Sequence, residues 1–402
     1  MSMAYTFKQA MTDVLSGEAA RFVPFAPRLD IWYRSRKLRG TLPAKYRNYT
    51  LPDVIDDLGV GYNTMIPDYL DTAEPDDWIN RGTGFYCSNT STCYTVKFRN
   101  VDRTYEEKNG DLRVTYRTPH GDLTSRTVLD GGMKAQGITI CAKTEYLVKS
   151  VEDYNAAGYL FENAEVIPQY GRLETFAEKI GDRGVVTAIG LIRESPARLL
   201  QMELMGFEQF TYAMYDYPNE TAELMSRLGT FLERCMIAAA GSCADVVTAG
   251  AHFDGTLTPP PFFRCHMLPY LQKYNKILRD RGKMMASHTD SDNAGLLELY
   301  IDAGIGVMDS VCTKPLTTQD YADVRRVTGD RAVLYGLIPS IVTLPDSVGD
   351  YDFDRFIDGL FNEILADGAR NVILAVADTT PPGADLERVR RVAGLAKELK
   401  PG

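Results

Sequence analysis

The residues best suited to chemistry lie in the segment KMMASHTDSDN, residues 283–293. Its apolar start predicts a strand ending at His288, and apolar residues at helical spacing resume after Asn293. An imidazole and a carboxylate, those of His288 and Asp290, therefore stand two residues apart where a strand gives way to a helix. One carboxylate of this turn can cap the helix. A helix needs only one such cap, so the remaining polar groups indicate a functional role.

A second imidazole follows the preceding predicted strand, residues 245–251, at His252. In a closed barrel this strand neighbours the one ending at His288, so His252, His288 and Asp290 would converge. Two imidazoles, a carboxylate and an open position are a sensible catalytic Zn²⁺ site, because borderline ions accept neutral imidazole and carboxylate oxygen. We predict these three residues as metal ligands. The alternative is that they only cap helices or satisfy local hydrogen bonds.

Further polar residues follow other predicted strands. Asp378 ends the last strand and faces Asp30 on the first if the barrel closes. Several carboxylates around one mouth can act as metal ligands or as an acid and base with separated pKa values. The predicted catalytic residues are His288, Asp290, Asp378 and Asp254. The predicted substrate-binding residues are Arg28, Asp30, Trp32, Tyr33, His252, Phe253 and Tyr335. The residues around Arg28 could equally form a surface ion pair, Arg28 with Asp30, beside packed aromatic rings instead of a substrate pocket.

The elements that must position these residues alternate between strand and helix. Strands are predicted at residues 185–190, 245–251, 283–287, 306–311, 332–337 and 371–377, with helices between them. This rhythm predicts an α/β fold, a (β/α)8 TIM barrel formed by residues 1–402 as a single domain. Residues 92–130 instead alternate in polarity around NG and HG turns, which predicts an antiparallel β-meander within an N-terminal extension.

Composition excludes several classes of protein. The chain of 402 residues is 45% hydrophobic and 24% charged, which is typical of a globular protein with a sizeable core. Its formal net charge of -10, without basic tracts, argues against nucleic acid or an anionic membrane as a partner. We find no long apolar run and no signal-peptide core at the start. The seven cysteines include no Cys-x-x-Cys pair, so we expect reduced thiols in a cytoplasmic enzyme.

Much of the chain resembles the uroporphyrinogen decarboxylase superfamily, and within it the corrinoid-dependent methyltransferase branch. The similar segments are VPFAPRLDIWY, YRTPHGDLTS, VEDYNAAGYLFEN, IGDRGVV, AHFDGTLTPPPFFRCHMLPYL, GKMMASHTDSDNAGLLELYIDAGIGVMDSV, YGLIPS and VILAVADTTPPGADLERV. The resemblance implies a (β/α)8 barrel with an N-terminal extension. It also implies transfer of a methyl group to the cobalt of a corrinoid carried by a partner protein, and a homodimer.

The departures from that family pattern bear on function. Thiol-directed members hold zinc with a His-x-Cys pair and a later Cys, whereas this chain has His288-Thr289-Asp290 and Asp378 at those places. A carboxylate site is harder and suits a thiol less, so we predict a small methylated donor, a methyl ether undergoing O-demethylation. The alternatives are a metal-free lyase that decarboxylates an acidic substrate, or a binding protein that lost its chemistry. The arginine-rich motif of the decarboxylases is matched at Arg28 alone.

Overall fold

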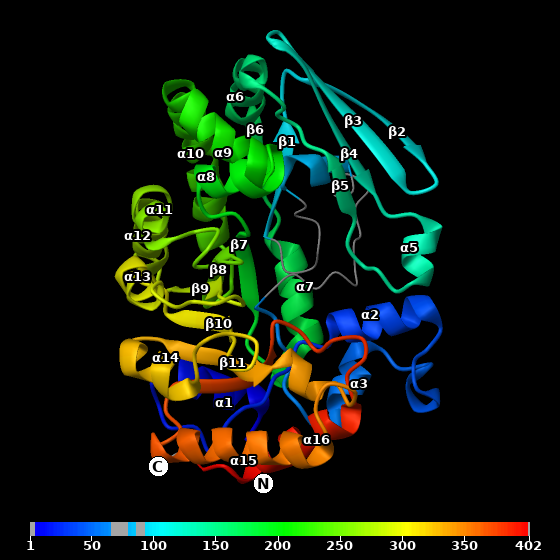
Figure 1. Ribbon diagram of the computed structural model, residues 1–402, viewed down its shortest axis with the longest axis vertical. Helices are drawn as coiled ribbons and strands as arrows, with labels where there is room; N and C mark the ends of the chain where they lie inside the picture. Colours follow the sequence, from blue (N-terminus) through cyan, green and yellow to red (C-terminus); the bar gives the residue numbers. More distant parts are fainter. Residues whose placement is uncertain (1–4, 66–78, 86–92, 401–402) are drawn as a thin grey trace.

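The structure, a computed structural model, describes residues 5–65, 79–85 and 93–400. At its centre lies a six-stranded parallel sheet in the order β12-β11-β10-β9-β8-β7 (Figure 1). The strands are β7 (Thr187–Leu191), β8 (Val246–Ala251), β9 (Met284–His288), β10 (Val307–Val311), β11 (Val333–Pro339) and β12 (Val372–Ala377). They are continuous apolar runs because helices cover the sheet and both faces are buried. All six agree with the predicted strands to within two residues, and all run parallel as predicted.

The gap between β12 and β7 is closed by two segments of irregular backbone. In the first, Phe25 forms an isolated parallel bridge with Leu374 of β12. The amide of Ala26 donates to the Leu374 carbonyl at 2.8 Å, and the Leu374 amide donates to the Pro24 carbonyl at 2.8 Å. Pro24 and Pro27 have no amide proton, so this segment cannot form a full ladder on both sides. It occupies a strand position without being a regular strand.

The second closing segment runs from residue 60 to 65. The Gly61 amide donates to the Phe25 carbonyl at 2.8 Å, which joins the two segments. On its other side the Thr64 hydroxyl donates to the Val185 carbonyl at 2.6 Å and accepts from the Thr187 amide at 3.1 Å. The Tyr62 amide also donates to the Arg183 carbonyl at 2.8 Å, so one backbone bond and one side chain together take the place of a regular ladder. With six strands and two such segments the barrel has eight positions, which confirms the predicted fold class.

Helices surround this barrel (Figure 1). Their bounds are α1 (Phe7–Leu15), α2 (Asp30–Arg39), α3 (Leu51–Leu58), α5 (Gly131–Ala135), α6 (Tyr154–Glu162), α7 (Tyr170–Ile180), α8 (Pro196–Leu199), α9 (Phe207–Asp216), α10 (Pro218–Ala240), α11 (Pro260–His266), α12 (Leu268–Arg279), α13 (Leu297–Ala303), α14 (Tyr321–Thr328), α15 (Asp350–Ala366) and α16 (Leu386–Glu398). A five-residue π-helix, Leu200–Leu204, follows α8 directly. Within the described ranges, no helix combines the length and the apolar character needed to cross a bilayer.

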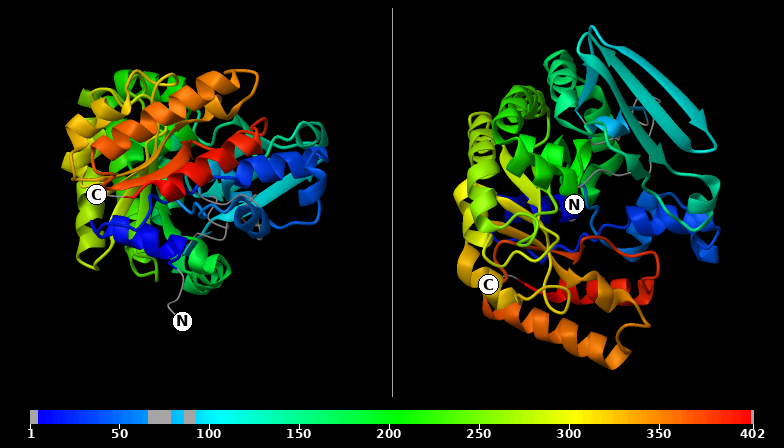
Figure 2. Two further views of the ribbon diagram at one scale, coloured as in Figure 1. Left: turned by 90° about the horizontal axis from the view of Figure 1, so that it is seen from below. Right: turned by 45° about the horizontal axis from the view of Figure 1, so that its top comes forward.

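An antiparallel sheet stands to one side of the barrel (Figure 2). It has the order β2 (Asp102–Lys108), β3 (Asp111–Thr118), β4 (Gly121–Val128) and β5 (Ala142–Glu145). The predicted NG turn joins β2 and β3, with Asn109 and Gly110 both at positive φ. The predicted limits of 92–130 differ from this sheet at both ends. The first strand, β1 (Tyr94–Phe98), pairs with β6 (Ala164–Pro168) instead, and the meander continues to residue 145.

A buried group of ion pairs connects this sheet with the loop after β7. Lys143 of β5 and Arg193 both contact the carboxylate of Glu203, at 2.7 and 2.9 Å. Burial alone would raise the pKa of Glu203, but the two cations outweigh it and lower that pKa to about 2. Because the folded-state pKa lies below the ordinary value, this group stabilises the fold above pH 4.5 and less as the pH falls toward 2.

We therefore expect Glu203→Gln to lower the free energy of unfolding at pH 7 by on the order of 3 kcal/mol. The difference from the natural protein should shrink as the pH is lowered from 6 to 3, measured by urea unfolding at each pH. Glu165→Gln is the control, because Glu165 pairs with Arg99 at an exposed site and such pairs contribute little. A difference that does not change with pH would contradict this assignment.

Candidate functional site

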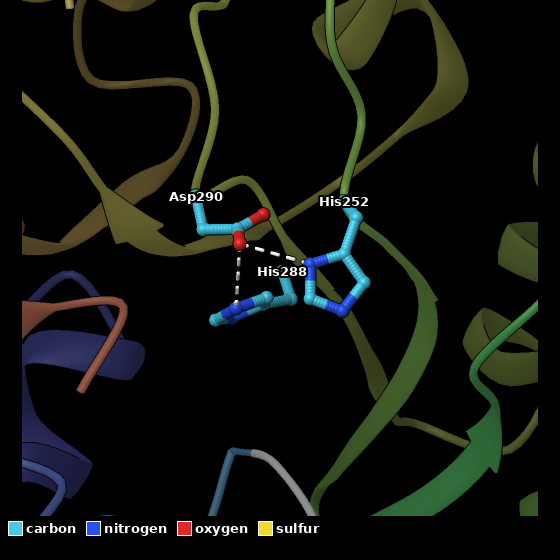
Figure 3. A group of neighbouring side chains, drawn as sticks. All are labelled: His252, His288 and Asp290. Carbon is cyan, nitrogen blue, oxygen red and sulfur yellow. Dashed lines mark hydrogen bonds and ion pairs between the residues drawn. The ribbon is translucent and has the colours of Figure 1, made fainter. Parts of the chain in front are cut away.

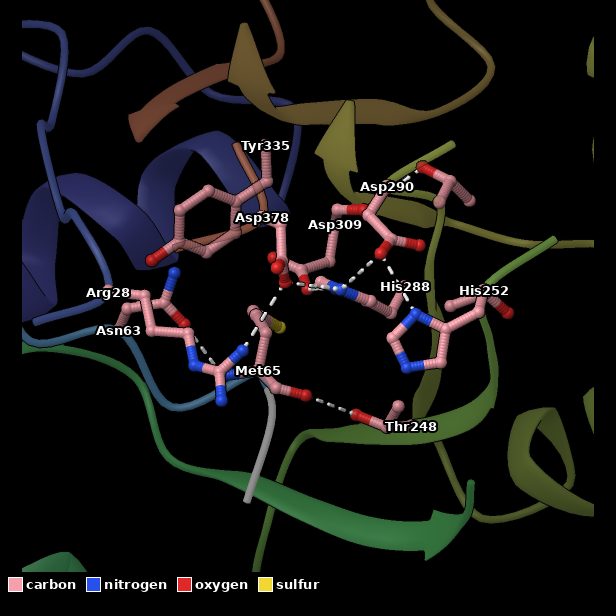
Figure 4. A network of polar contacts seen from close by, with 12 residues as sticks. Arg28, Asn63, Met65, Thr248, His252, His288, Asp290, Asp309, Tyr335 and Asp378 are labelled. Carbon is pink, nitrogen blue, oxygen red and sulfur yellow. Dashed lines mark hydrogen bonds and ion pairs between the residues drawn. The ribbon is translucent and has the colours of Figure 1, made fainter. Parts of the chain in front are cut away.

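Three carboxylates surround one buried imidazole at the carboxyl end of the strands (Figure 4). His288 is the last residue of β9, and its side chain is fully buried. Its Nδ1 lies 2.6 Å from Asp309 Oδ2. Its Nε2 lies 3.1 Å from Asp378 Oδ1 and 3.5 Å from Asp290 Oδ2. The ring therefore links neighbouring strands across the mouth of the barrel.

The charges at this cluster shift the pKa values of its members. Burial opposes a charge on His288, but Asp290, Asp309 and Asp378 together raise the pKa of its imidazole well above the ordinary value. Burial likewise opposes the charges of Asp290 and Asp378, yet the adjacent His288 lowers the pKa of both carboxyl groups, with help from His252 and Arg28 respectively. Asp378 is therefore ionised at neutral pH. It is poorly suited to the proton-donating role considered from the sequence.

His252 completes the group from the neighbouring strand β8 (Figure 3). Its Nδ1 lies 2.9 Å from Asp290 Oδ2, and its ring stands perpendicular to that of His288 at a centroid distance of 5.3 Å. One ligand atom from each of His252, His288 and Asp290 lies within 4.8 Å of the other two. The structure thus brings together the three residues predicted as metal ligands, from the ends of two adjacent strands.

The donor set and one unsatisfied atom fit a bound cation. Asp290 Oδ1 is buried and has no hydrogen-bond partner among the described residues, although its Oδ2 contacts both imidazoles. A buried carboxylate oxygen without a partner is unfavourable unless a cation or a further ligand meets it. Two imidazoles and a carboxylate with an open position are the ligands of catalytic Zn²⁺ sites. His252, His288 and Asp290 would hold such an ion.

Asp309 is a site residue to which the sequence analysis assigned no role. It lies within β10, is 3% exposed, and fixes Nδ1 of His288 so that Nε2 faces Asp290 and Asp378. A carboxylate behind a ligating histidine orients the ring and makes it a stronger ligand. A signal was present, since an acidic residue inside an apolar strand requires a buried partner. The sequence did not show which partner.

The profile of the family described as uroporphyrinogen decarboxylase (URO-D) matches residues 146–399, more than half of the chain. The chain belongs to the uroporphyrinogen decarboxylase family. Among solved structures it is similar to a methyltransferase from Methanosarcina mazei, with a TM-score of 0.55 and 16% sequence identity over 98% of this chain and 99% of that one. A search of curated proteins finds no significant match. The similarity in structure supports the barrel assignment over nearly the whole chain.

In this member of the URO-D family, Arg28 joins the first closing segment to the cluster. Its Nε lies 2.9 Å from Asp30 Oδ1, and its Nη1 lies 3.4 Å from Asp378 Oδ1 (Figure 4). Asp378 and Asp30 are therefore neighbours through the guanidinium, as barrel closure requires. Tyr335 of β11 supports the same segment, because its hydroxyl donates to the Ala26 carbonyl at 3.2 Å. The guanidinium is shared between two carboxylates.

The predicted aromatic pocket residues lie in the packed interior. Trp32 is fully buried and its ring packs against Tyr46. The Tyr33 hydroxyl donates to the Tyr49 carbonyl at 2.7 Å. Phe253 is fully buried and packs against the rings of Phe263 and Tyr300. The sequence showed aromatic residues near a strand end but not which direction each ring takes.

The carboxylate of Asp254 makes its hydrogen bonds within its own loop. It accepts the backbone amides of Thr256 and Leu257 at 2.8 and 3.1 Å. Such bonds are typical of an aspartate that shapes a turn. Asp254 therefore stabilises the loop after β8, the helix-capping kind of role that the sequence analysis left open for strand-end carboxylates.

Asn293 holds the loop that carries Asp290. Its side-chain amide donates to the carbonyls of Thr289 and Ser291, at 2.8 and 2.9 Å, on either side of Asp290. Its Oδ1 accepts from the Tyr300 hydroxyl at 2.6 Å. Both donor hydrogens of this buried amide are bonded to the loop, so the backbone on both sides of the carboxylate is fixed.

Proposed function

We propose that this protein is a methyltransferase that moves a methyl group from a small methyl ether to the cobalt of a corrinoid carried by a partner protein. The observation that carries the proposal is the His252, His288 and Asp290 cluster with its unsatisfied carboxylate oxygen. Membership of the URO-D family and the similarity to a solved methyltransferase support the same reading.

Methyl transfer from an ether requires that the departing oxygen be made a better leaving group. Reduced cobalt would supply an electron pair, the methyl–cobalt bond would form as the methyl–oxygen bond breaks, and the departing oxygen would keep the bonding electrons and take a proton from water. Zinc held by the three ligands would act as a Lewis acid toward that oxygen. Asp309 orients the His288 ring for this task, and Asn293 holds the loop of Asp290. Because Asp378 is ionised, it serves to position His288 and Arg28 rather than to protonate the product.

The charge at the barrel mouth disfavours the alternative of a decarboxylase for an acidic substrate. Two groups that can carry a positive charge, Arg28 and His288, lie among four carboxylates. These are the carboxylates of Asp30, Asp290, Asp309 and Asp378. The guanidinium of Arg28, the residue matched to the decarboxylase motif, already contacts two of the carboxylates. A polyacidic substrate would meet like charge there and would have to displace existing partners. A neutral methyl ether meets no such repulsion.

The test is a screen of methylated compounds with reduced corrinoid protein, following cobalt methylation by absorbance. With a methyl ether we expect methyl–cobalt to form in step with release of the demethylated alcohol or phenol. Protein treated with a chelator should lose the activity and regain it with Zn²⁺. Carbon dioxide release from a carboxylated compound by chelator-treated protein would instead support the lyase.

A further inference from the structure

Behind His252 lies a buried arginine for which the proposed chemistry has no direct use. Arg198 belongs to the short helix α8 and is fully buried. Its Nη2 donates to the carbonyl oxygens of Ala251 and His252, at 3.3 and 2.9 Å. Its Nη1 donates to Gln201 Oε1 at 2.6 Å. The guanidinium therefore contacts the backbone that carries a proposed metal ligand.

The backbone that it contacts is strained. His252 has φ +59°, in the left-handed region that a residue with a side chain rarely adopts. Just before it Gly250 has φ +88°, and the pairing of β8 with β9 shifts register between Thr248 and Ala251. Such conformations persist when the surrounding structure over-determines them. Two hydrogen bonds from one rigid, planar group to consecutive carbonyls are a constraint of that kind.

The π-helix supplies the other half of this support. Gln201, in the segment Leu200–Leu204, accepts from Arg198 and donates through Nε2 to the Leu257 carbonyl at 3.3 Å. Arg198 and Gln201 together therefore hold the loop after β8 at its first residue, His252, and again at Leu257. Wide helical turns of this type are frequent at functional sites. The loop between these two points is the one shaped internally by Asp254.

A purely structural explanation would make Arg198 an ion-pair partner that fills the core. Glu194 is buried nearby, yet among the described residues Arg198 has no carboxylate within ion-pair distance, and Glu194 Oε2 has no hydrogen-bond partner. The charge of Glu194 still acts on Arg198, but a guanidinium directed at backbone carbonyls is not explained by ion pairing alone. Its contribution is geometric, because it determines the direction of the His252 carbonyl.

We propose that Arg198 is a positioning residue: it holds His252 in the left-handed conformation from which its imidazole reaches Asp290, and so completes the three-ligand site. The inference deepens the proposed function and rests on it for the identity of the ligand, a divalent zinc-like cation. The placement of His252 against Asp290, 2.9 Å away, is its direct consequence.

The test compares Arg198→Met and Arg198→Lys with the natural protein. Zinc affinity is measured by competition with a chromophoric chelator, and ligand geometry by the visible absorption of the Co²⁺-loaded protein. We expect Arg198→Met to bind Zn²⁺ roughly 10–100-fold more weakly, the loss typical when a residue supporting a metal ligand is removed. The Co²⁺ bands should weaken as one protein ligand is lost. Lysine restores one donor and should recover part of the affinity.

Arg325→Met is the matched control. Arg325 is also a buried arginine that donates to two backbone carbonyls, those of Gly329 at 2.7 Å and Arg370 at 2.5 Å, and it differs from Arg198 in pairing with Asp367 at 2.7 Å. These lie before β11 and β12, at the opposite end of the barrel. This variant should lose thermal stability and keep the zinc affinity and the Co²⁺ spectrum of the natural protein. Equal losses of affinity in both variants would show a general structural effect and overturn the inference.

Crystal structures of the metal-free natural protein and of Arg198→Met decide the geometry independently of any metal. We expect His252 to leave positive φ in the variant and its Nδ1 to move beyond hydrogen-bond distance of Asp290. A variant that keeps this contact together with full zinc affinity overturns the inference. Should the natural protein bind neither Zn²⁺ nor Co²⁺, the proposed function loses its metal, and the crystal structures alone decide the role of Arg198.

Discussion

Replacing His288 with alanine is expected to abolish zinc binding and to reduce methyl transfer by roughly a thousandfold or more. His288 is the central residue of the cluster and contacts all three carboxylates around it. Loss of Lewis-acid assistance removes several kcal/mol of transition-state stabilisation, and about 4 kcal/mol corresponds to a factor of a thousand. Zinc content by elemental analysis and the rate of cobalt methylation are the two measurements.

The structural consequence of this change must be separated from the catalytic one. Alanine leaves the buried carboxylate of Asp309 without its partner, and breaking a buried pair in this way costs about 3–5 kcal/mol of stability. The double variant His288→Leu with Asp309→Leu removes both charges and should fold better while still lacking zinc and activity. His120→Ala, at an exposed turn, should change neither. Full zinc content and full turnover in folded His288→Ala protein would remove the cluster from the mechanism.

Replacing Asp290 with cysteine is expected to strengthen zinc binding by roughly tenfold or more while slowing demethylation by a similar factor. The change restores the His-x-Cys pattern of thiol-directed family members. A thiolate is a softer and stronger zinc ligand than a carboxylate, and it leaves the ion a weaker Lewis acid toward an ether oxygen. Chelator competition and the rate of alcohol release measure the two effects in one preparation.

Asp292→Cys is the control for that substitution. Asp292 lies two residues further along the same loop, where its carboxylate accepts the amides of Ala294 and Thr318 at 3.0 Å each. Its loss should lower stability by about 1 kcal/mol and leave zinc affinity unchanged. Unchanged zinc affinity and turnover in Asp290→Cys would show that the carboxylate of Asp290 is not a ligand.

The fold was largely predictable because its strands are apolar runs between amphipathic helices, a pattern that sequence displays directly. The two closing segments were not both predictable. Prolines at 24 and 27 marked the first as unusual. The second depends in part on the Thr64 hydroxyl, whose partner, the Val185 carbonyl, lies 121 residues away in the sequence.

The cluster was predictable to the extent that its members follow strands. His252, His288 and Asp290 could be placed together from barrel connectivity alone. Asp309 and Arg198 could not, because one lies inside a strand and the other on a helix, and each is defined by a partner distant in sequence. Trp32 and Phe253 were assigned to a pocket from residue type, which does not distinguish a ring that faces a cavity from one that packs in the core.

The register shifts at the strand ends separate the choice of side chains at the barrel mouth from the regular pairing of the sheet. Pairing is irregular between β7 and β8, between β8 and β9 and between β10 and β11, each time near the carboxyl end. His252 and Ser310 at positive φ lie at these irregular ends. A change of side chain there leaves the regular ladder below it intact. The proposed ligand set could therefore be exchanged, carboxylate for thiolate, without redesigning the sheet, which would make this mouth a practical site for engineering metal selectivity.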